Sequence, residues 1–213
     1  MLKGAGRLQA VAKVDLSISS QTIDAPDRSF VDLLRDYVSL TKPRLSSLVL
    51  FTTAGGMWLA DRPLSASTWI CALVGTLGTV GSANALNCVI ERHSDRFMRR
   101  TANRPLPAGR IGVVPALIFS VLLGVISVPL LVWGVNSITG ILGLLSLLSY
   151  ALVYTPLKAR THWAMIVGAI PGAIPPLMGW TAATNTVGMP ALVVFSILFF
   201  WQLPHFIAIA LFR

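Results

Sequence analysis

Hydrophobic residues gather in six long segments separated by short polar stretches. We place these segments at about 45–60, 67–90, 112–133, 138–156, 163–181 and 190–212. An α-helix crosses the hydrocarbon core of a bilayer with about 20 mostly apolar residues, and most of the segments reach that length, although the first is short. The pattern therefore predicts an all-α, polytopic membrane protein with about six transmembrane helices.

The start of the chain differs from these segments. Residues 1–40 are polar, mixed in charge, and without the roughly 7–15-residue apolar core of a secretory signal peptide. We interpret 1–40 as a polar cytosolic N-terminal segment and 41–213 as a membrane domain. Basic residues but no acid precede Asp15, so a mitochondrial presequence is the alternative to a bacterial cytosolic leader.

Composition supports the membrane interpretation. The chain is 54% hydrophobic and only 12% charged, whereas soluble domains carry roughly a quarter charged residues. A net charge of +9 would suggest nucleic acid as the partner of a soluble protein. In a membrane protein the preference of basic residues for cytoplasmic loops explains this charge more simply. We expect the lipid bilayer as a partner and no nucleic acid.

Basic residues also predict the orientation. They precede the first segment and fill the second and fourth loops, whereas the first loop has only Arg62 and the third and fifth have none. Because cytoplasmic loops are rich in Lys and Arg, the N-terminus should be cytoplasmic. We expect the cell inner membrane, with the mitochondrial inner membrane as the alternative. The basic positions are Lys42, Arg44, Arg92, Arg96, Arg99, Arg100, Arg104, Arg110, Lys158 and Arg160.

The end of the second segment carries candidate metal ligands. Asn87, Glu91 and Asp95 are spaced at i, i+4 and i+8, which places them on one face of a helix. Polar groups at the end of a membrane span are costly and usually functional. Mg²⁺ prefers oxygen ligands and commonly links one or two carboxylates to a substrate phosphate. Each residue alone could be a helix cap or a surface ion pair, but together with the arginines that follow they favour a metal–diphosphate site.

Two basic loops could bind the diphosphate. Arg99 and Arg104 follow the acidic face, and Lys158 and Arg160 could reach the same group from the opposite side. Simple anchoring of the loops to the cytoplasmic side is the alternative. Tyr154 precedes the second of these loops, where it either lies at the membrane interface or leans into a cavity.

Three blocks of sequence resemble the heme O synthase branch of the UbiA-type intramembrane prenyltransferases. The first block alone points to the wider family, and the other two favour the heme O branch. The resemblance covers most of residues 38–213. The blocks are 87–95 with 98–105, 154–161 with 172–180, and 201–206.

The resemblance implies transfer of a farnesyl group from farnesyl diphosphate to a vinyl group of protoheme IX, with addition of water. The product, heme O, would serve heme–copper oxidase biogenesis. It also implies Mg²⁺ at the acidic face, with the basic residues around the diphosphate. His205 lies inside a membrane segment, where it could contact heme together with Tyr154, or could be a hydrogen-bonded core histidine. His93 and His162 are expected at the wet interface.

Some features depart from the family pattern. Glu91 stands where aspartate is commoner, which keeps an oxygen ligand but moves it by one methylene. The family's second acidic motif and about three further helices of a nine-helix bundle would follow Arg213. We therefore expect the chain to be truncated and inactive alone. The alternatives are a branch that prenylates a quinone-type aromatic acceptor, or a carrier of an anionic isoprenoid lipid.

Overall fold

The computed structural model describes residues 29–158, 160–161 and 163–212. By its contacts the chain divides into residues 1–33 and 34–213, and the fold below is that of the second unit. Most of the predicted polar N-terminal segment, residues 1–28, lies outside the described residues, as does His162.

Most of the described residues are helical, and the predicted segments all appear as helices. α1 (Phe30–Leu40) precedes them. The first three segments correspond to α2 (Pro43–Leu59), α3 (Ala66–Asp95) and α4 (Val113–Gly134). α5 (Ser137–Leu148), a π-helical stretch η1 (Ser149–Tyr154) and α6 (Thr155–Leu157) together form the fourth. α7 (Ala164–Thr184) and α8 (Met189–Leu211) form the last two.

The predicted class of fold, an all-α polytopic membrane protein, is confirmed. Five helical stretches in the described chain are long and apolar enough to cross a membrane, and α2 has only 17 residues. Helices suit this environment because each satisfies its own backbone hydrogen bonds in lipid.

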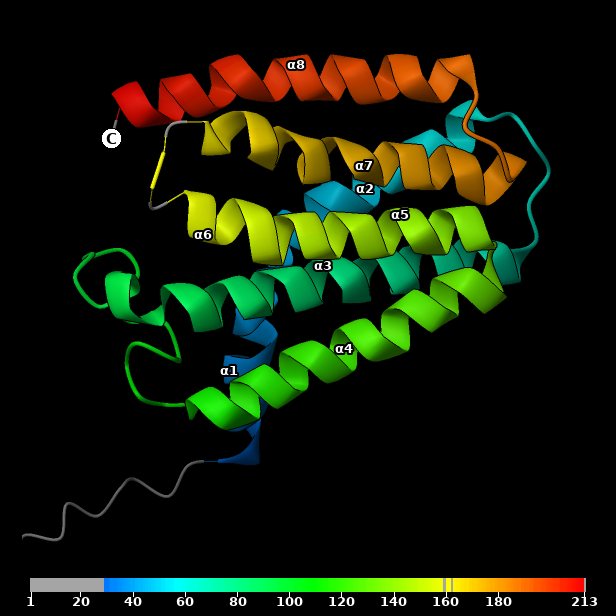
Figure 1. The fold of residues 1–213 in the computed structure, drawn as a ribbon. Helices are drawn as coiled ribbons and strands as arrows, with labels where there is room; N and C mark the ends of the chain where they lie inside the picture. The colour runs from blue at the N-terminus through cyan, green and yellow to red at the C-terminus, as the bar shows by residue number, and fades with distance from the viewer. Residues whose placement is uncertain (1–28, 159, 162, 213) are drawn as a thin grey trace, which may run out of the picture. The chain divides into compact units, whose positions relative to one another are not determined.

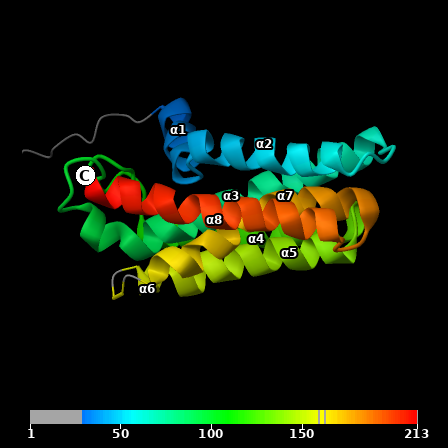
Figure 2. The same cartoon turned by 90° about the horizontal axis from the view of Figure 1, so that it is seen from above.

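α7 lies at the centre of the packing, against α2, α5 and α8, while α3 packs mainly against α4. Figures 1 and 2 show α8 lying along α7 and α4 along α3. In both views the ends of α3 and α8 and the short α6 lie at the same end of the bundle.

Glycine permits the closest of these helix contacts. A Cβ atom on Gly56 of α2 would overlap the backbone of Pro176 in α7, and one on Gly179 of α7 would overlap the backbone at Thr53. Small residues at such crossings let two backbones approach, which is the usual way in which membrane helices pack. The position of α2 relative to α7 therefore depends on these two glycines.

Candidate functional site

The candidate metal ligands lie on the last turns of α3, and each accepts a hydrogen bond from a different cation. Lys42 Nζ donates to Asn87 Oδ1 at 2.7 Å and Lys158 Nζ to Glu91 Oε1 at 3.2 Å. Arg104 Nη1 donates to Asp95 Oδ2 at 2.7 Å. We call these six residues the polar cluster: Lys42, Asn87, Glu91, Asp95, Arg104 and Lys158.

Three separate segments supply the cations. Lys42 comes from the turn between α1 and α2, Arg104 from the loop after α3, and Lys158 from the turn after α6. The sequence placed Arg104 and Lys158 on opposite sides of the acidic face, and the structure brings both to it. Charge-assisted bonds of this kind are stronger than neutral ones, so the three cations help to hold the oxygen ligands in place.

The amide of Asn87 is held from two sides. Its oxygen accepts from Lys42, while its Nδ2 donates to Thr155 Oγ1 at 3.3 Å. Thr155 Oγ1 in turn donates to the carbonyl oxygen of Tyr150 at 2.8 Å. This carbonyl belongs to the π-helical stretch η1, and such stretches often occur at functional sites. The irregular turn therefore links the end of α5 to the polar cluster.

Asp95 is the most buried carboxylate of the cluster. Its side chain is 1% exposed and that of Arg104 is 29% exposed. Thr101 Oγ1 donates to the backbone carbonyl of Asp95 at 2.9 Å. A charge so deeply buried needs a partner, and Arg104 supplies it. The pair fixes the start of the loop that follows α3.

A second ion pair holds the other end of the same loop. Arg110 Nε lies 3.0 Å from Asp36 Oδ1 of α1, and Arg96 Nε donates to the carbonyl oxygen of Pro107 at 3.3 Å. Pro105 and Pro107 prevent this stretch from continuing α3 as a helix. The loop is therefore tied to α1 at one end and to α3 at the other, with Arg104 aimed at the cluster.

Lys42 is the functional candidate that sequence reasoning missed, because we used it only to orient the chain. Its backbone is left-handed, with φ of 51°, directly before Pro43 opens α2. Burial lowers the pKa of Lys42, and the nearby Arg104 and Lys158 act in the same direction. The Lys-Pro pair at a helix start was the available signal. It could not show that the side chain reaches α3.

Two of the predicted diphosphate ligands stand apart from the cluster. Arg99 and Arg160 are exposed, and within the described part of the chain neither side chain makes a hydrogen bond or an ion pair. Both lie on the loops that supply Arg104 and Lys158. A bound anion could still attract them.

The donor set fits Mg²⁺ in chemistry. Asn87, Glu91 and Asp95 offer amide and carboxylate oxygens on one helix face, the ligands that this ion prefers. No group of three or more His, Cys, Asp or Glu side chains that could hold a metal occurs among the described residues. Glu91 is the more accessible carboxylate, with its side chain 15% exposed against 1% for Asp95. A bound ion would therefore need oxygens from the substrate phosphates as well.

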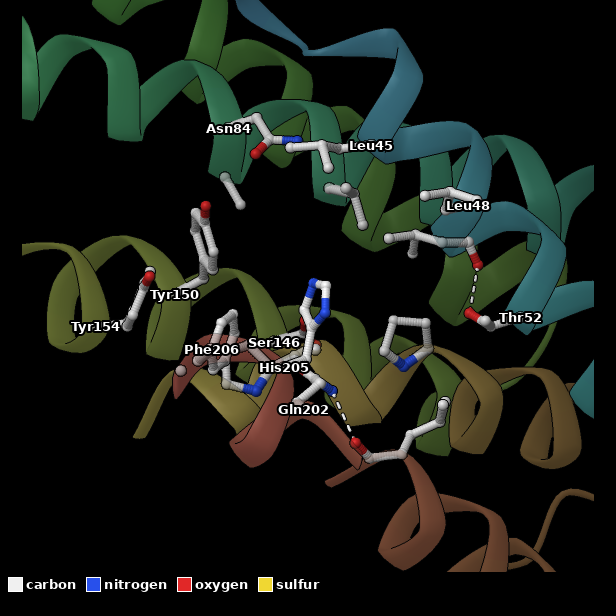
Figure 3. A pocket seen from close by; sticks show the side chains of 18 of the residues that line it. Leu45, Leu48, Thr52, Asn84, Ser146, Tyr150, Tyr154, Gln202, His205 and Phe206 are labelled. Carbon is white, nitrogen blue, oxygen red and sulfur yellow. Dashed lines mark hydrogen bonds between the residues drawn. The ribbon is translucent and has the colours of Figure 1, made fainter. Parts of the chain in front are cut away.

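An apolar cavity of about 340 Å³ adjoins the polar cluster. It lies between α2, α3, α5, η1, α7 and α8, and Asn84 and Tyr154 on its wall lie beside members of the cluster. Asn84 is one turn before Asn87 on α3, and Tyr154 is one turn before Lys158, whose backbone N–H donates to the Tyr154 carbonyl oxygen at 2.9 Å. Figure 3 shows the labelled side chains around the cavity. A charged group at the cluster and an apolar chain in the cavity could thus belong to one ligand.

The predicted contacts Tyr154 and His205 both line this cavity. Tyr154 packs beside Tyr150, with ring centroids 5.2 Å apart, and a Cβ at Gly168 would overlap its ring. His205 stacks on Trp201 with centroids 5.0 Å apart and ring planes at 12°. His93 is exposed, as expected of the interface.

Membrane-spanning helices that enclose an apolar cavity, with a cluster of cations and oxygen ligands at its mouth, define a membrane protein suited to an amphipathic anion. Residues 49–213 match the UbiA prenyltransferase family, and the chain belongs to that family. It is a multi-pass membrane protein.

The similar proteins carry a more specific name. The chain is 58% identical over 191 residues to the protoheme IX farnesyltransferase of Myxococcus xanthus, covering 90% of this chain and 65% of that protein. It is 51% identical over 179 residues to that of Anaeromyxobacter dehalogenans, covering 84% and 61%. The chain thus spans less than two thirds of the length of these relatives.

Solved structures share the fold. A UbiA homolog from Archaeoglobus fulgidus bound to GPP and Mg²⁺ aligns with a TM-score of 0.66 at 17% identity, covering 82% of this chain and 62% of that one. The apo structure of a UbiA homolog from Aeropyrum pernix aligns with a TM-score of 0.61 at 19% identity, covering 75% and 60%.

Proposed function

We propose that the protein containing this chain transfers a farnesyl group from farnesyl diphosphate to a vinyl group of protoheme IX and so forms heme O. The supporting observation is the 58% identity over 191 residues to a protoheme IX farnesyltransferase. The polar cluster at the mouth of an apolar cavity suits both parts of the prenyl donor. We place the protein in the cell inner membrane with its N-terminus in the cytoplasm, where heme O would supply heme–copper oxidases.

The polar cluster would bind the diphosphate and stabilise it as it leaves. Lys42, Arg104 and Lys158 present three positive charges along one face of α3. Preorganised charges aimed at the departing group are the largest source of rate enhancement in such reactions. Arg99 and Arg160 would add weaker, solvent-screened attraction from outside.

Asn87, Glu91 and Asp95 would hold Mg²⁺, which would neutralise charge on the departing diphosphate. Glu91 offers the more accessible oxygens, while buried Asn87 and Asp95 would act while still bonded to Lys42 and Arg104. The chain itself positions these oxygens on the last turns of α3.

The cavity would protect the allylic cation. Its wall is largely apolar, which limits the access of bulk water, and the rings of Tyr150 and Tyr154 present faces that can stabilise a cation. The vinyl π-bond of the acceptor is the nucleophile, so the protein need supply none. Tyr154 and His205 would contact the porphyrin acceptor.

The test uses membranes that contain the full-length protein, supplied with farnesyl diphosphate, protoheme and Mg²⁺. Mass analysis of the extracted hemes should show heme O. Prenylation of a quinone-type aromatic acceptor in place of heme would assign the protein to another branch of the family. Binding of farnesyl diphosphate without turnover of either acceptor would make it a carrier.

A further inference from the structure

We propose that His205 accepts the proton from the water that completes the reaction, with Gln202 one turn earlier on α8 holding that water. This inference rests on the proposed function, because only transfer to a vinyl group with hydration needs such a step. It concerns the wall of the cavity formed by α8, which the polar cluster does not reach.

The chemistry requires a base at this point. The C1–O bond of farnesyl diphosphate breaks, and the diphosphate leaves with the electron pair. The terminal vinyl carbon bonds to C1, which leaves a positive charge on the vinyl carbon next to the porphyrin ring. A water oxygen then donates a lone pair to that carbon and must lose a proton. If no water is held there, a neighbouring carbon loses the proton and an alkene forms.

Three of the polar side chains on the cavity wall already donate to backbone carbonyl oxygens. Thr52 Oγ1 donates to the carbonyl oxygen of Val49 at 2.8 Å, and Ser146 Oγ donates to that of Pro171 at 3.3 Å. Asn84 Nδ2 donates to the carbonyl oxygen of Thr41 at 3.2 Å. Their donor groups are already used, so these three side chains are poor candidates for proton exchange.

His205 has no hydrogen-bond partner among the described residues, and its imidazole is suited to accept a proton. Within the described part of the chain its ring nitrogens make no hydrogen bond, although the ring lines the cavity. Imidazole takes up protons near neutral pH, whereas the hydroxyls of Tyr150 and Tyr154 are poor proton acceptors. Among the described lining residues His205 is therefore the natural base.

Packing sets the direction of the His205 ring. One face stacks on Trp201, with centroids 5.0 Å apart and planes at 12°, and Phe206 lies 6.3 Å away by centroid. Figure 3 shows the ring reaching into the cavity from α8, opposite Asn84 of α3. The stack leaves the edge of the ring, which carries both nitrogens, to face the cavity.

Gln202 supplies the second contact for the water. Its Nε2 donates to the carbonyl oxygen of Leu198 at 3.3 Å, which leaves Oε1 to accept a bond. A Cβ atom on Gly172 of α7 would overlap this amide, so the glycine makes room for it. Residues 202 and 205 lie three apart and share a face of α8. One water could therefore donate to both.

Position also explains why the water would not destroy the prenyl donor. The donor's charged end would lie at the polar cluster, on α3 and the turn after α6, while the water would lie on α8. Water held on the opposite wall meets the acceptor's cation before the allylic cation. The separation would favour hydrated product over free farnesol.

The test compares His205→Ala with the unchanged full-length protein and with His93→Ala, a control at an exposed position of α3. We measure diphosphate release, the masses of the extracted hemes and the absorption spectrum of bound heme. We expect hydrated product to fall about a hundredfold in His205→Ala. An alkene lighter by one water should appear, diphosphate release should persist, and free imidazole should restore hydration.

Gln202→Leu, which keeps the size of the side chain and removes Oε1, should lower the hydrated fraction about fivefold. Undiminished heme O in His205→Ala would overturn the proposal. So would loss of all farnesyl transfer together with a changed spectrum of bound heme, which would make His205 an iron ligand. If the unchanged protein makes no farnesylated heme at all, the proposed function is wrong. That result differs from a failure of the His205 proposal, in which the unchanged protein still makes heme O.

Discussion

The two sides of the candidate site are built in opposite ways. At the end of α3 each oxygen ligand already has a cationic partner, and Asp95 is almost fully buried. On α8 His205 and Trp201 are exposed and stack on each other. Buried charges must be paired before substrate binds, because an unpaired charge in a low-dielectric site is costly. A wall that contacts a large, flat acceptor instead needs side chains whose polar atoms are not already bonded to the protein.

We expect the largest loss of activity from a change at Glu91, the more accessible carboxylate of the polar cluster. Glu91→Gln in the full-length protein should lower heme O formation about a thousandfold, because a metal ligand and the partner of Lys158 are lost together. The protein should still insert into membranes at normal levels. Asp61→Asn, the same chemical change in the turn after α2, should leave activity unchanged. Normal turnover in Glu91→Gln would remove the metal site from the cluster.

Both sides of the site depend on the contact between α2 and α7. Alanine substitutions at two adjacent glycines of α2 test this contact. Gly56→Ala would press a methyl group onto the backbone of Pro176 and should lower the free energy of unfolding by about 1–3 kcal/mol. Gly55→Ala meets nothing within 4 Å and should be neutral or slightly stabilising. Unfolding midpoints in detergent measure the difference. Equal midpoints for the two variants would contradict the close crossing.

The pH dependence of turnover tests whether the positive charge of Lys42 is needed for activity. Because burial lowers the pKa of Lys42, its positive charge is lost as pH rises, starting below the usual lysine value of about 10.4. Activity should therefore fall on the alkaline side earlier than for an exposed lysine. In Lys42→Arg, which stays charged, the fall should move to higher pH. An unchanged alkaline limb, measured from initial rates, would exclude Lys42 from diphosphate binding.

The smallest effects should come from the exposed arginines. Arg99→Gln and Arg160→Gln should each lower activity less than about threefold, because solvent-exposed charges contribute roughly 0–1 kcal/mol. Lys158→Gln, which removes a partner of Glu91, should cost more. Rates at low and high salt provide the measurement, since the arginine effects should disappear at high ionic strength. A large loss in Arg99→Gln would show that the loop closes on the diphosphate.

The positions of the helices followed closely from the sequence. The segments expected at about 67–90 and 112–133 are the helices Ala66–Asp95 and Val113–Gly134. A membrane span must be a long apolar run, so a local property of the chain is enough to find it. The shared face of Asn87, Glu91 and Asp95 followed in the same way, from the helical period.

The partners of these residues could not be predicted. Lys42 is 45 residues from Asn87 in sequence, and Lys158 is 67 residues from Glu91. The expected continuous fourth span contains a π-helical stretch that carries Tyr150 and Tyr154. Such a stretch arises from the packing around it and has no reliable local pattern.

Sequence alone therefore determined the membrane helices, the acidic face of α3 and the resemblance to a prenyltransferase family, because each depends on residues close together in the chain. Tertiary structure decided which cation meets which oxygen, and it placed His205 and Gln202 on the cavity wall opposite Asn84. Those contacts depend on how α2, α3, α7 and α8 approach one another. Glycines such as Gly56 and Gly179 fix that approach through backbone contacts between helices that are distant in sequence.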